Sequence, residues 1–167
     1  MTDLATLYQT DYAQWTQRNA ELLRAGRFEE LDIEHLLDEL SDMSKSDRRE
    51  LHTRLLVLLA HLLKWEFQYP ILSERWREFD GRSWRATIIE QRDQIAGLLQ
   101  ASPGLKSLLD EAIASAYSAA VKLAHKETRL PLTTFPTVCP YGAEQLLDDE
   151  FYPDATPAQD CAEGANT

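Results

Sequence analysis

Apolar residues recur at helical spacing in five stretches of the chain, and the densest stretch lies near its centre. Between Arg48 and Gln68 the run LLVLLAHLL is apolar apart from His61. Its stripe consists of residues three or four positions apart, namely Leu51, Leu55, Leu58, Leu59, Leu62 and Trp65. The run is far shorter than the roughly 20 apolar residues that cross a bilayer, and charges flank it on both sides. We therefore expect residues 48–69 to form the central buried helix of a bundle, with His52 packed in the core.

Two helices are predicted before the central one. The first covers about residues 3–25, and Gly26 supplies its left-handed C-terminal stop. Asp32 is a good N-cap for a second helix over residues 33–43. Residues 44–46 are expected to form a short break between this second helix and the central helix. The second helix should bury a stripe made of Ile33, Leu36, Leu37, Leu40 and Met43.

Two more helices and an extended segment are predicted after the central helix, which Pro70 ends or kinks. Ser83 should cap a helix over residues 84–99, and Ser102 with Pro103 should start another that continues to about residue 127. After Arg129 the run LPLTTFPTVCPYG carries three prolines, which favours an extended path over the bundle surface. A short helix is expected around residues 143–149.

Together these elements predict an all-α protein. We expect a single-domain helical bundle of four to five main helices over residues 1–153, wrapped by the extended, Pro-containing C-terminal segment. A chain of 167 residues is long enough to bury a sizeable core in one domain. The tail DATPAQDCAEGANT, residues 154–167, is small and polar and is expected to be disordered.

The charge of the chain is unevenly distributed. Residues 1–47 hold 4 basic and 11 acidic side chains, residues 48–130 hold 13 and 10, and residues 131–167 hold 0 and 7. A net charge of −11 argues against non-specific nucleic-acid binding, which rests on neutralising phosphates. The first interpretation is a solvated acidic surface that complements the middle of the chain. The alternative is a mildly basic middle that lines a groove for an anionic ligand.

The cysteines and the N-terminal residues predict a compartment. Cys139 and Cys161 have no metal-ligand spacing and do not suggest a disulfide framework. The segment TDLATLYQTDY has no apolar run after a basic start, so it does not read as a signal peptide. We expect a cytoplasmic protein that is not inserted in a membrane.

No common catalytic motif is present in the sequence. GxGxxG, GxxxxGK[ST], GxSxG and HExxH are all missing. Helical bundles can still bind metals through Glu and His that project inward from facing helices. His52 and His61 are about 13 Å apart along a helix and cannot share one ion, so a metal site would use Glu39 with either His61 or His52. The plainer interpretation is a satisfied core histidine and a solvated acidic helix face.

A more general hypothesis than the metal site is a polar catalytic or ligand-binding site between the second and third predicted helices. Glu39 would act there as ligand or general base, with His61, Lys64 and Arg92 as its partners. No cofactor is assigned.

Two further groups of residues could carry chemistry. Arg75 to Arg92 is rich in arginine with interleaved Trp76 and Trp84, a combination that can bind phosphates and stack on bases. Glu74 just before it and three acidic residues within it dilute the stretch to a balance of +1, and arginine stems packed over core tryptophans are the commoner outcome. Cys139 would be a catalytic thiol only if a histidine, His61 or His125, approached it.

Six runs of the sequence carry a family resemblance: YQTDYAQW, LLRAGRFEELDIEHLLDELSDM, LHTRLLVLLAHLLKW, SWRATIIEQRDQI, SPGLKSLLDEAI and ETRLPLTTFPTVCPYGAEQLLDDEFYP. In this order they resemble the bacterial domain-of-unknown-function family numbered twenty-nine, over about residues 8–153. The resemblance implies the fold and no activity. Two features depart from the family pattern, because Ser41 stands where a further acidic residue is usual and residues 69–81 form a longer link. The matching polar positions are Asp11, Trp15, Asp32, Asp38, Glu39, His61, Lys64, Trp65, Trp84, Gln91, Arg92 and Cys139.

Three functions remain open from the sequence. The first is a small interaction or regulatory module whose spare apolar helix faces would allow a homodimer. The second is an enzyme or ligand-binding protein that uses the polar site around Glu39. The third, least favoured, is a nucleic-acid-associated protein that uses the arginine-rich middle.

Overall fold

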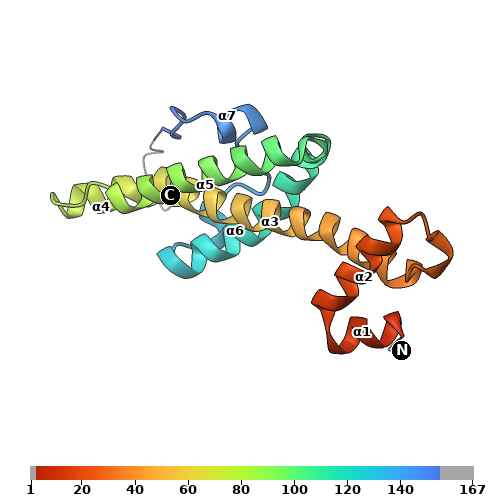
Figure 1. Cartoon of the computed structure of the whole chain (residues 1–167). Coiled ribbons are helices and arrows are strands. Elements are labelled where there is room, and N and C mark those ends of the chain that lie inside the picture. Colours follow the sequence, from red (N-terminus) through yellow and green to blue (C-terminus); the bar gives the residue numbers. More distant parts are fainter. Residues whose placement is uncertain (1–2, 155–167) are drawn as a thin grey trace, which may run out of the picture. The chain divides into compact units, whose positions relative to one another are not determined.

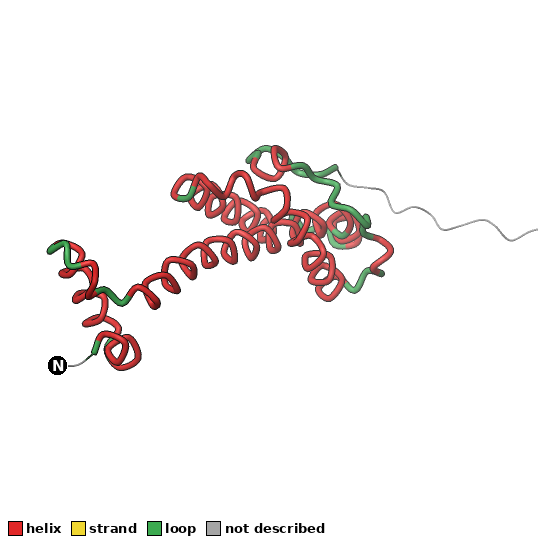
Figure 2. The backbone as a smooth tube through the Cα atoms, turned by 90° about the vertical axis from the view of Figure 1, so that its right-hand side faces the viewer, coloured by secondary structure: helices red, strands yellow, loops and turns green. Residues whose placement is uncertain are grey.

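The computed structural model describes residues 3–154 and shows an all-α protein (Figures 1 and 2). These residues contain seven α-helices and no strand, which confirms the predicted fold class. The chain divides into two compact units, Met1–Ser46 and Asp47–Thr167. The tail expected to be disordered lies outside the described residues, apart from Asp154.

Unit Met1–Ser46 begins with two helices where one was predicted. Helix α1 covers Leu4–Thr10 and α2 covers Tyr12–Arg24, followed by the 3-10 turn Phe28–Glu30. The prediction of one helix was wrong because Asp11 leaves the helical conformation and its carboxylate accepts a hydrogen bond from Gln14 N at 3.0 Å. Gly26 has a φ of 71°, as the expected left-handed stop requires.

Asp32 caps the next helix and also holds α2. His35 N donates to Asp32 Oδ1 at 3.4 Å, which confirms the predicted N-cap. Trp15 Nε1 donates to Asp32 Oδ2 at 2.9 Å, and the backbone N–H of Asp32 donates to Asn19 Oδ1 at 3.1 Å. Trp15 and Asn19 are buried. A single carboxylate therefore satisfies both the helix start and a buried indole.

Helix α3 is continuous over Ile33–Phe67, a length of 35 residues. The expected interruption at Ser44 to Ser46 was wrong. Serine costs only a few tenths of a kcal/mol relative to alanine inside a helix, and neither glycine nor proline stands there to stop it. The second and third predicted helices are therefore one helix.

The expected buried stripe of residues 33–43 was also wrong. Leu36 is half-buried. The other four side chains are more than half exposed: Ile33 at 51%, Leu37 at 61%, Leu40 at 62% and Met43 at 66%.

The core of unit Asp47–Thr167 is built on the second part of α3. Leu55, Leu58 and Leu62 are all 0% exposed. Helix α5, Arg82–Ala101, and helix α6, Leu109–Thr128, lie on either side of α3 in Figure 1. Ala116, Ala120 and Ala124 are fully buried on α6, and their small size permits close helix approach. The central buried helix is confirmed.

A proline and a glycine shape the connections from α3 to α4 and from α4 to α5. Helix α4, Tyr69–Arg75, carries Pro70 in its first turn and is bent by 49° from α3, as expected of a proline. Gly81 has a φ of 67° and precedes α5, and a Cβ added there would lie 2.8 Å from the Tyr69 ring. Ser83 does not cap α5, which begins two residues earlier than predicted.

The start of α6 also differs from the prediction. A 3-10 helix over Pro103–Leu108 precedes α6. The hydroxyl of Ser102 does not cap it and instead donates to Asp47 Oδ2 at 2.7 Å. This bond ties the turn before α6 back to α3.

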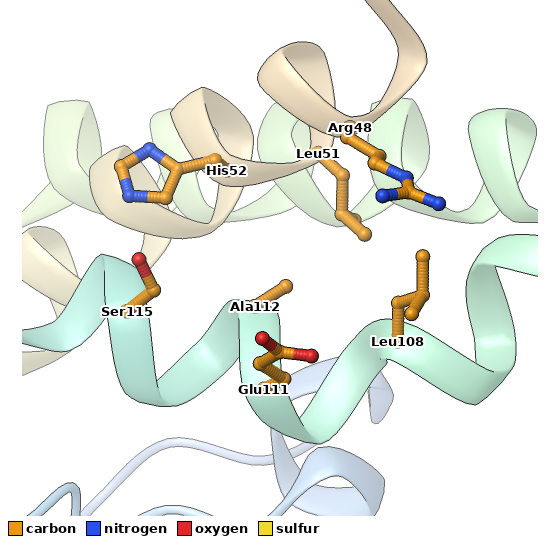
Figure 3. A pocket seen from close by; sticks show the side chains of 7 residues that line it. All are labelled: Arg48, Leu51, His52, Leu108, Glu111, Ala112 and Ser115. Carbon is orange, nitrogen blue, oxygen red and sulfur yellow. The ribbon is translucent and has the colours of Figure 1, made fainter. Parts of the chain in front are cut away.

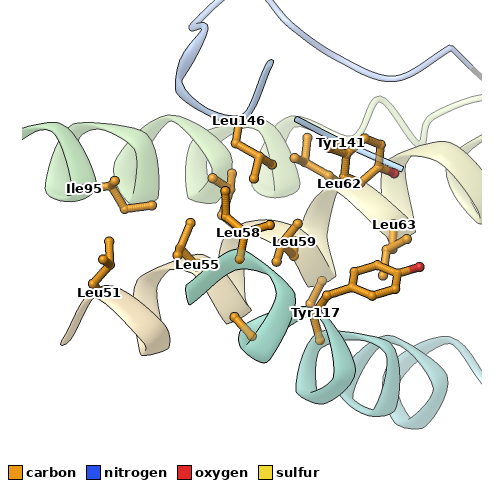
Figure 4. Packing of buried hydrophobic residues seen from close by; sticks show 14 of the residues in the cluster. Leu51, Leu55, Leu58, Leu59, Leu62, Leu63, Ile95, Tyr117, Tyr141 and Leu146 are labelled. Atoms are coloured by element: carbon orange, nitrogen blue, oxygen red, sulfur yellow. The ribbon is translucent and has the colours of Figure 1, made fainter. Parts of the chain in front are cut away.

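The C-terminal segment is extended and packs onto the helices, as predicted. It contains the 3-10 turn Leu132–Thr134 and the short helix α7, Ala143–Leu147. Phe135, Tyr141 and Leu146 are buried, and Figure 4 shows the last two beside the leucines of α3. The segment therefore completes the core.

In the described part of the chain, no single helix has the length and apolar composition needed to cross a membrane. The bent pair α3 and α4 reaches that threshold only when the two are counted together.

Candidate functional site

Glu39 is engaged within unit Met1–Ser46. Its Oε1 accepts a hydrogen bond from Tyr8 OH at 2.7 Å, and its Oε2 accepts one from Tyr12 OH at 2.9 Å. The bond to Glu39 raises the pKa of Tyr8 to about 12, helped by partial burial. The Tyr8 ring also stacks on His35, with centroids 4.0 Å apart. Glu39 thus joins both N-terminal helices to α3.

The expectation that Glu39 lies close to His61 required two helices packed antiparallel. That arrangement does not exist, because both residues lie on the continuous helix α3. The two separate helices that this hypothesis assumed are one helix, so each candidate residue is described in its own surroundings.

Lys64 is a buried cation that pairs with an exposed carboxylate. It is 6% exposed, and its Nζ donates to Glu127 Oε2 at 2.6 Å. The same ammonium lies 5.1 Å from the centroid of the Trp84 ring. Burying a charge is tolerated only when a partner compensates it, and here one partner comes from α6 and the other from α5. Lys64 therefore links α3 to two helices.

His61 lies one turn before Lys64 on α3. Its Nδ1 is 2.8 Å from Val57 O, and because a carbonyl oxygen only accepts, Nδ1 carries the proton and Nε2 has the lone pair. Burial lowers the pKa of His61, and the charge of Lys64 acts in the same direction. A neutral imidazole with an available Nε2 can act as a base or as a ligand.

Arg92 anchors the C-terminal segment. It is 2% exposed, with Nε donating to Leu146 O at 2.9 Å and Nη2 to Phe151 O at 2.7 Å. Longer bonds of 3.4 Å reach Gln145 O and Asp149 O. All four acceptors are backbone carbonyls, so this guanidinium closes the end of α7 and the turn after it.

The structure contains no candidate metal centre within residues 3–154, where no group of three or more His, Cys, Asp and Glu side chains could hold an ion. His52 is half-buried, contrary to the core position expected for it. It lines a small cavity of about 190 Å³ between α3 and α6 (Figure 3). The other lining residues are Arg48, Leu51, Leu108, Glu111, Ala112 and Ser115.

The arginine-rich segment does not cover core tryptophans as expected. Trp76 is 64% exposed, and the cation over Trp84 is Lys64. Arg82 pairs with Asp80 at 2.9 Å, and Arg85 lies 5.0 Å from the Tyr152 ring. The arginines are thus divided among separate local contacts.

Cys139 is half-buried in the extended segment. Its Sγ donates to Tyr141 O at 3.4 Å, and burial raises the pKa of the thiol. His125, one of the two expected activators, has its Nδ1 2.7 Å from Leu130 O. A protonated thiol in this setting is a poor nucleophile.

Three residues of these clusters were missed in the sequence: Tyr8, Tyr12 and Glu127. Tyr8 and Tyr12 are four positions apart in the sequence, a spacing that would give them a shared face if one helix ran through Asp11. Nothing in the sequence pairs Glu127 with Lys64, because 63 residues separate them. Only tertiary packing identifies that partner.

These contacts describe an all-α protein in which the buried Lys64 and Arg92 and the half-buried Asp32 hold helices and an extended C-terminal segment in place. The family model for "Domain of unknown function DUF29" matches residues 7–152. The chain therefore belongs to the DUF29 family, which confirms the resemblance seen in its sequence. No curated protein and no solved structure matches the chain.

Proposed function

We propose that the protein is a helical interaction module that docks a partner on the first part of α3. The observation that carries this proposal is an exposed apolar stripe, hereafter the α3 face. Its members are Ile33, Leu37, Leu40 and Met43, each 51–66% exposed. They recur at intervals of three or four residues, so they occupy one side of the helix.

The α3 face is a separate side of the helix from the one that contacts α1 and α2. His35 and Glu39 make those contacts, through Tyr8 and Tyr12. At 100° per residue, Glu39 points about 160° away from Leu37. The N-terminal helices therefore occupy one side of α3 and leave the apolar side open.

An isolated exposed leucine is ordinary, but four large apolar side chains on one stripe are characteristic of a binding surface. Fully burying one such side chain is worth about 1.5–3 kcal/mol, so covering the stripe provides a substantial driving force. A partner helix that lays its own apolar face along α3 is the geometry that suits this surface. We also propose a cytoplasmic location for this module, which the lack of a disulfide framework supports.

A photo-crosslinker tests the proposal directly. Benzoyl-phenylalanine at position 37 of the full chain should give a discrete adduct in producing cells, identified by mass spectrometry. Adding Leu40→Asp should abolish that adduct, because a charge in the stripe prevents docking. The matched control places the same crosslinker at Ile89, an exposed apolar residue of α5. If position 37 gives no more adduct than position 89, or if Leu40→Asp leaves the adduct intact, the module does not dock through the α3 face.

A second candidate function is ligand binding or catalysis at His61 and Lys64. The observation that favours it is the neutral His61 with its Nε2 available, one turn from a buried cation. Glu127 takes the place of Glu39 as the carboxylate of this cluster, because it is the acid that contacts Lys64. Arg92 is committed to the C-terminal carbonyls and has no part in it.

Nuclear magnetic resonance of the His61 ring nitrogens would test the second candidate. Zinc ion and inorganic phosphate, added separately, are the probes. A saturable shift of the Nε2 resonance that Lys64→Met alters supports a site, and an unchanged resonance up to millimolar probe argues against one.

A further inference from the structure

We infer that the partner of the α3 face is a second copy of this chain, packed antiparallel along the same face. This inference rests on the proposed function and specifies its partner. It is carried by the spacing of the stripe and by the distribution of charge along its edge.

The spacing is that of a heptad seam. Ile33, Leu37, Leu40 and Ser44 follow one another at intervals of four, three and four residues. This alternation keeps a stripe facing a partner helix, as in a coiled coil. Leu36 and Met43 lie along one edge of the stripe and widen it.

In an antiparallel pair, the seam of one copy packs against the same seam of the second copy. Leu37 lies opposite Leu40 of the second copy, and Ile33 lies opposite Ser44 of the second copy, so that a large residue meets a small one. At the edge, Leu36 lies beside Met43 of the second copy. A two-fold axis generates each of these contacts twice from one surface, which is how an isologous dimer is built.

Charge along the other edge selects the direction. Glu34 stands at its N-terminal end, and Lys45 and Arg48 stand at its C-terminal end. An antiparallel pair sets Glu34 near Lys45 of the second copy, whereas a parallel pair sets this charged edge against the apolar edge of the second copy that carries Leu36 and Met43. Lys45 already contacts Asp42 at 3.5 Å, but both side chains are about 60% exposed, so exchanging that partner costs little. Complementary charge between Glu34 and Lys45 thus favours the antiparallel orientation of the pair.

The seam spans only about two heptads, which makes a small interface and a concentration-dependent dimer. Sedimentation equilibrium of the full chain, diluted from about 100 µM to about 1 µM, should show a shift from two chains to one. Leu37→Asp with Leu40→Asp should give a single chain at every concentration. Ile89→Asp, the matched control on α5, should leave the shift unchanged. Circular dichroism verifies that each variant keeps its helices.

Charge reversal tests the orientation. Glu34→Lys alone and Lys45→Glu alone should each weaken the dimer severalfold, and the double variant should restore it, since the acid and the base exchange places. Weakening that the double variant does not repair would overturn the antiparallel arrangement.

The two levels of the hypothesis can fail separately. A native chain that stays single at about 100 µM, while position 37 still crosslinks to a different protein, removes the self-partner and leaves the docking function. A dimer that persists in Leu37→Asp with Leu40→Asp places self-association elsewhere and overturns the inference.

Discussion

The two parts of α3 have similar patterns of apolar residues, but those residues are exposed in the first part and buried in the second. Residues 33–46 carry four large apolar side chains that are 51–66% exposed, whereas Leu55, Leu58 and Leu62 further along are 0% exposed. Both parts repeat apolar residues every three or four positions, and both belong to one uninterrupted helix. The difference lies in what packs against them. Helices α5 and α6 and the C-terminal segment bury the second part, while α1 and α2 contact the first part through polar side chains.

This difference shows that an amphipathic pattern identifies the side of a helix that requires covering but not the element that covers it. In the second part the cover belongs to the same chain. In the first part the tyrosines of α1 and α2 bind Glu39, and the apolar side stays exposed.

The largest expected effect comes from substituting matched leucines in the two parts. Leu58→Ala should lower the free energy of unfolding by about 3–5 kcal/mol, because it leaves a cavity in a fully buried position. Leu40→Ala should change it by no more than about 0.5 kcal/mol when the protein is dilute. Urea unfolding followed by circular dichroism measures both values. Equal losses would show that the first part is buried in solution as well.

Substituting Arg92 tests whether the C-terminal segment buries the second part of α3. Arg92→Met removes four hydrogen bonds to carbonyls and should cost about 2–3 kcal/mol. Hydrogen exchange should accelerate at residues 141–152 and stay unchanged at residues 33–44. Arg85→Met, which loses only a contact with Tyr152, is the control and should have a small effect. Unaltered exchange at residues 141–152 would contradict the anchoring role.

Asp32 provides the corresponding test in the first part. Asp32→Ala removes the N-cap of α3 and the acceptor of Trp15, at a cost of about 1–2 kcal/mol. Asp32→Asn keeps a capping oxygen and should retain most of that stability. The measurement is hydrogen exchange of residues 4–40. If alanine and asparagine behaved alike, the cap would not be what holds this unit.

The smallest expected effect is the pH dependence of stability that His61 contributes in the second part of α3. Because burial lowers the pKa of His61 below its ordinary value of 6.5, the unfolded chain binds this proton more readily. Stability contributed by neutral His61 is therefore present above pH 6.5 and is lost as the pH falls toward the lowered value. The slope from this one group stays below about 1.4 kcal/mol per pH unit. Urea unfolding between about pH 7.5 and 5.5 should show a shallower slope in His61→Gln than in the native chain; identical slopes would contradict a buried neutral imidazole.

The Asp32 carboxylate shows what a local pattern can predict. A cap depends on residues three positions apart, and the sequence DIEHLLDEL contains that signal directly. The same local reasoning predicted the buried helix around Leu58 and the proline bend after Phe67. It was wrong at Ser44 to Ser46, because serine is only a weak helix breaker and the apolar and polar positions on either side continue the helix.

The candidate site was less predictable than the fold. Glu39, His61, Lys64 and Arg92 are polar residues in or near apolar stripes, which the sequence reveals. Their partners are Tyr8 and Tyr12, Val57, Glu127 and the C-terminal carbonyls. Of these, only Val57 lies within one helical turn of its partner, so the remaining contacts depend on how distant segments pack.

By itself the sequence determined the all-α class, the central helix, the Asp32 cap and the extended C-terminal segment, because each depends on neighbours within a few turns of chain. The tertiary structure decided that α3 is uninterrupted, that Lys64 pairs with Glu127 and that Arg92 holds the C-terminal carbonyls. It also decided that Ile33, Leu37, Leu40 and Met43 are open. Burial depends on which distant surfaces meet, and an apolar stripe has the same sequence signature whether its own chain or a second chain covers it.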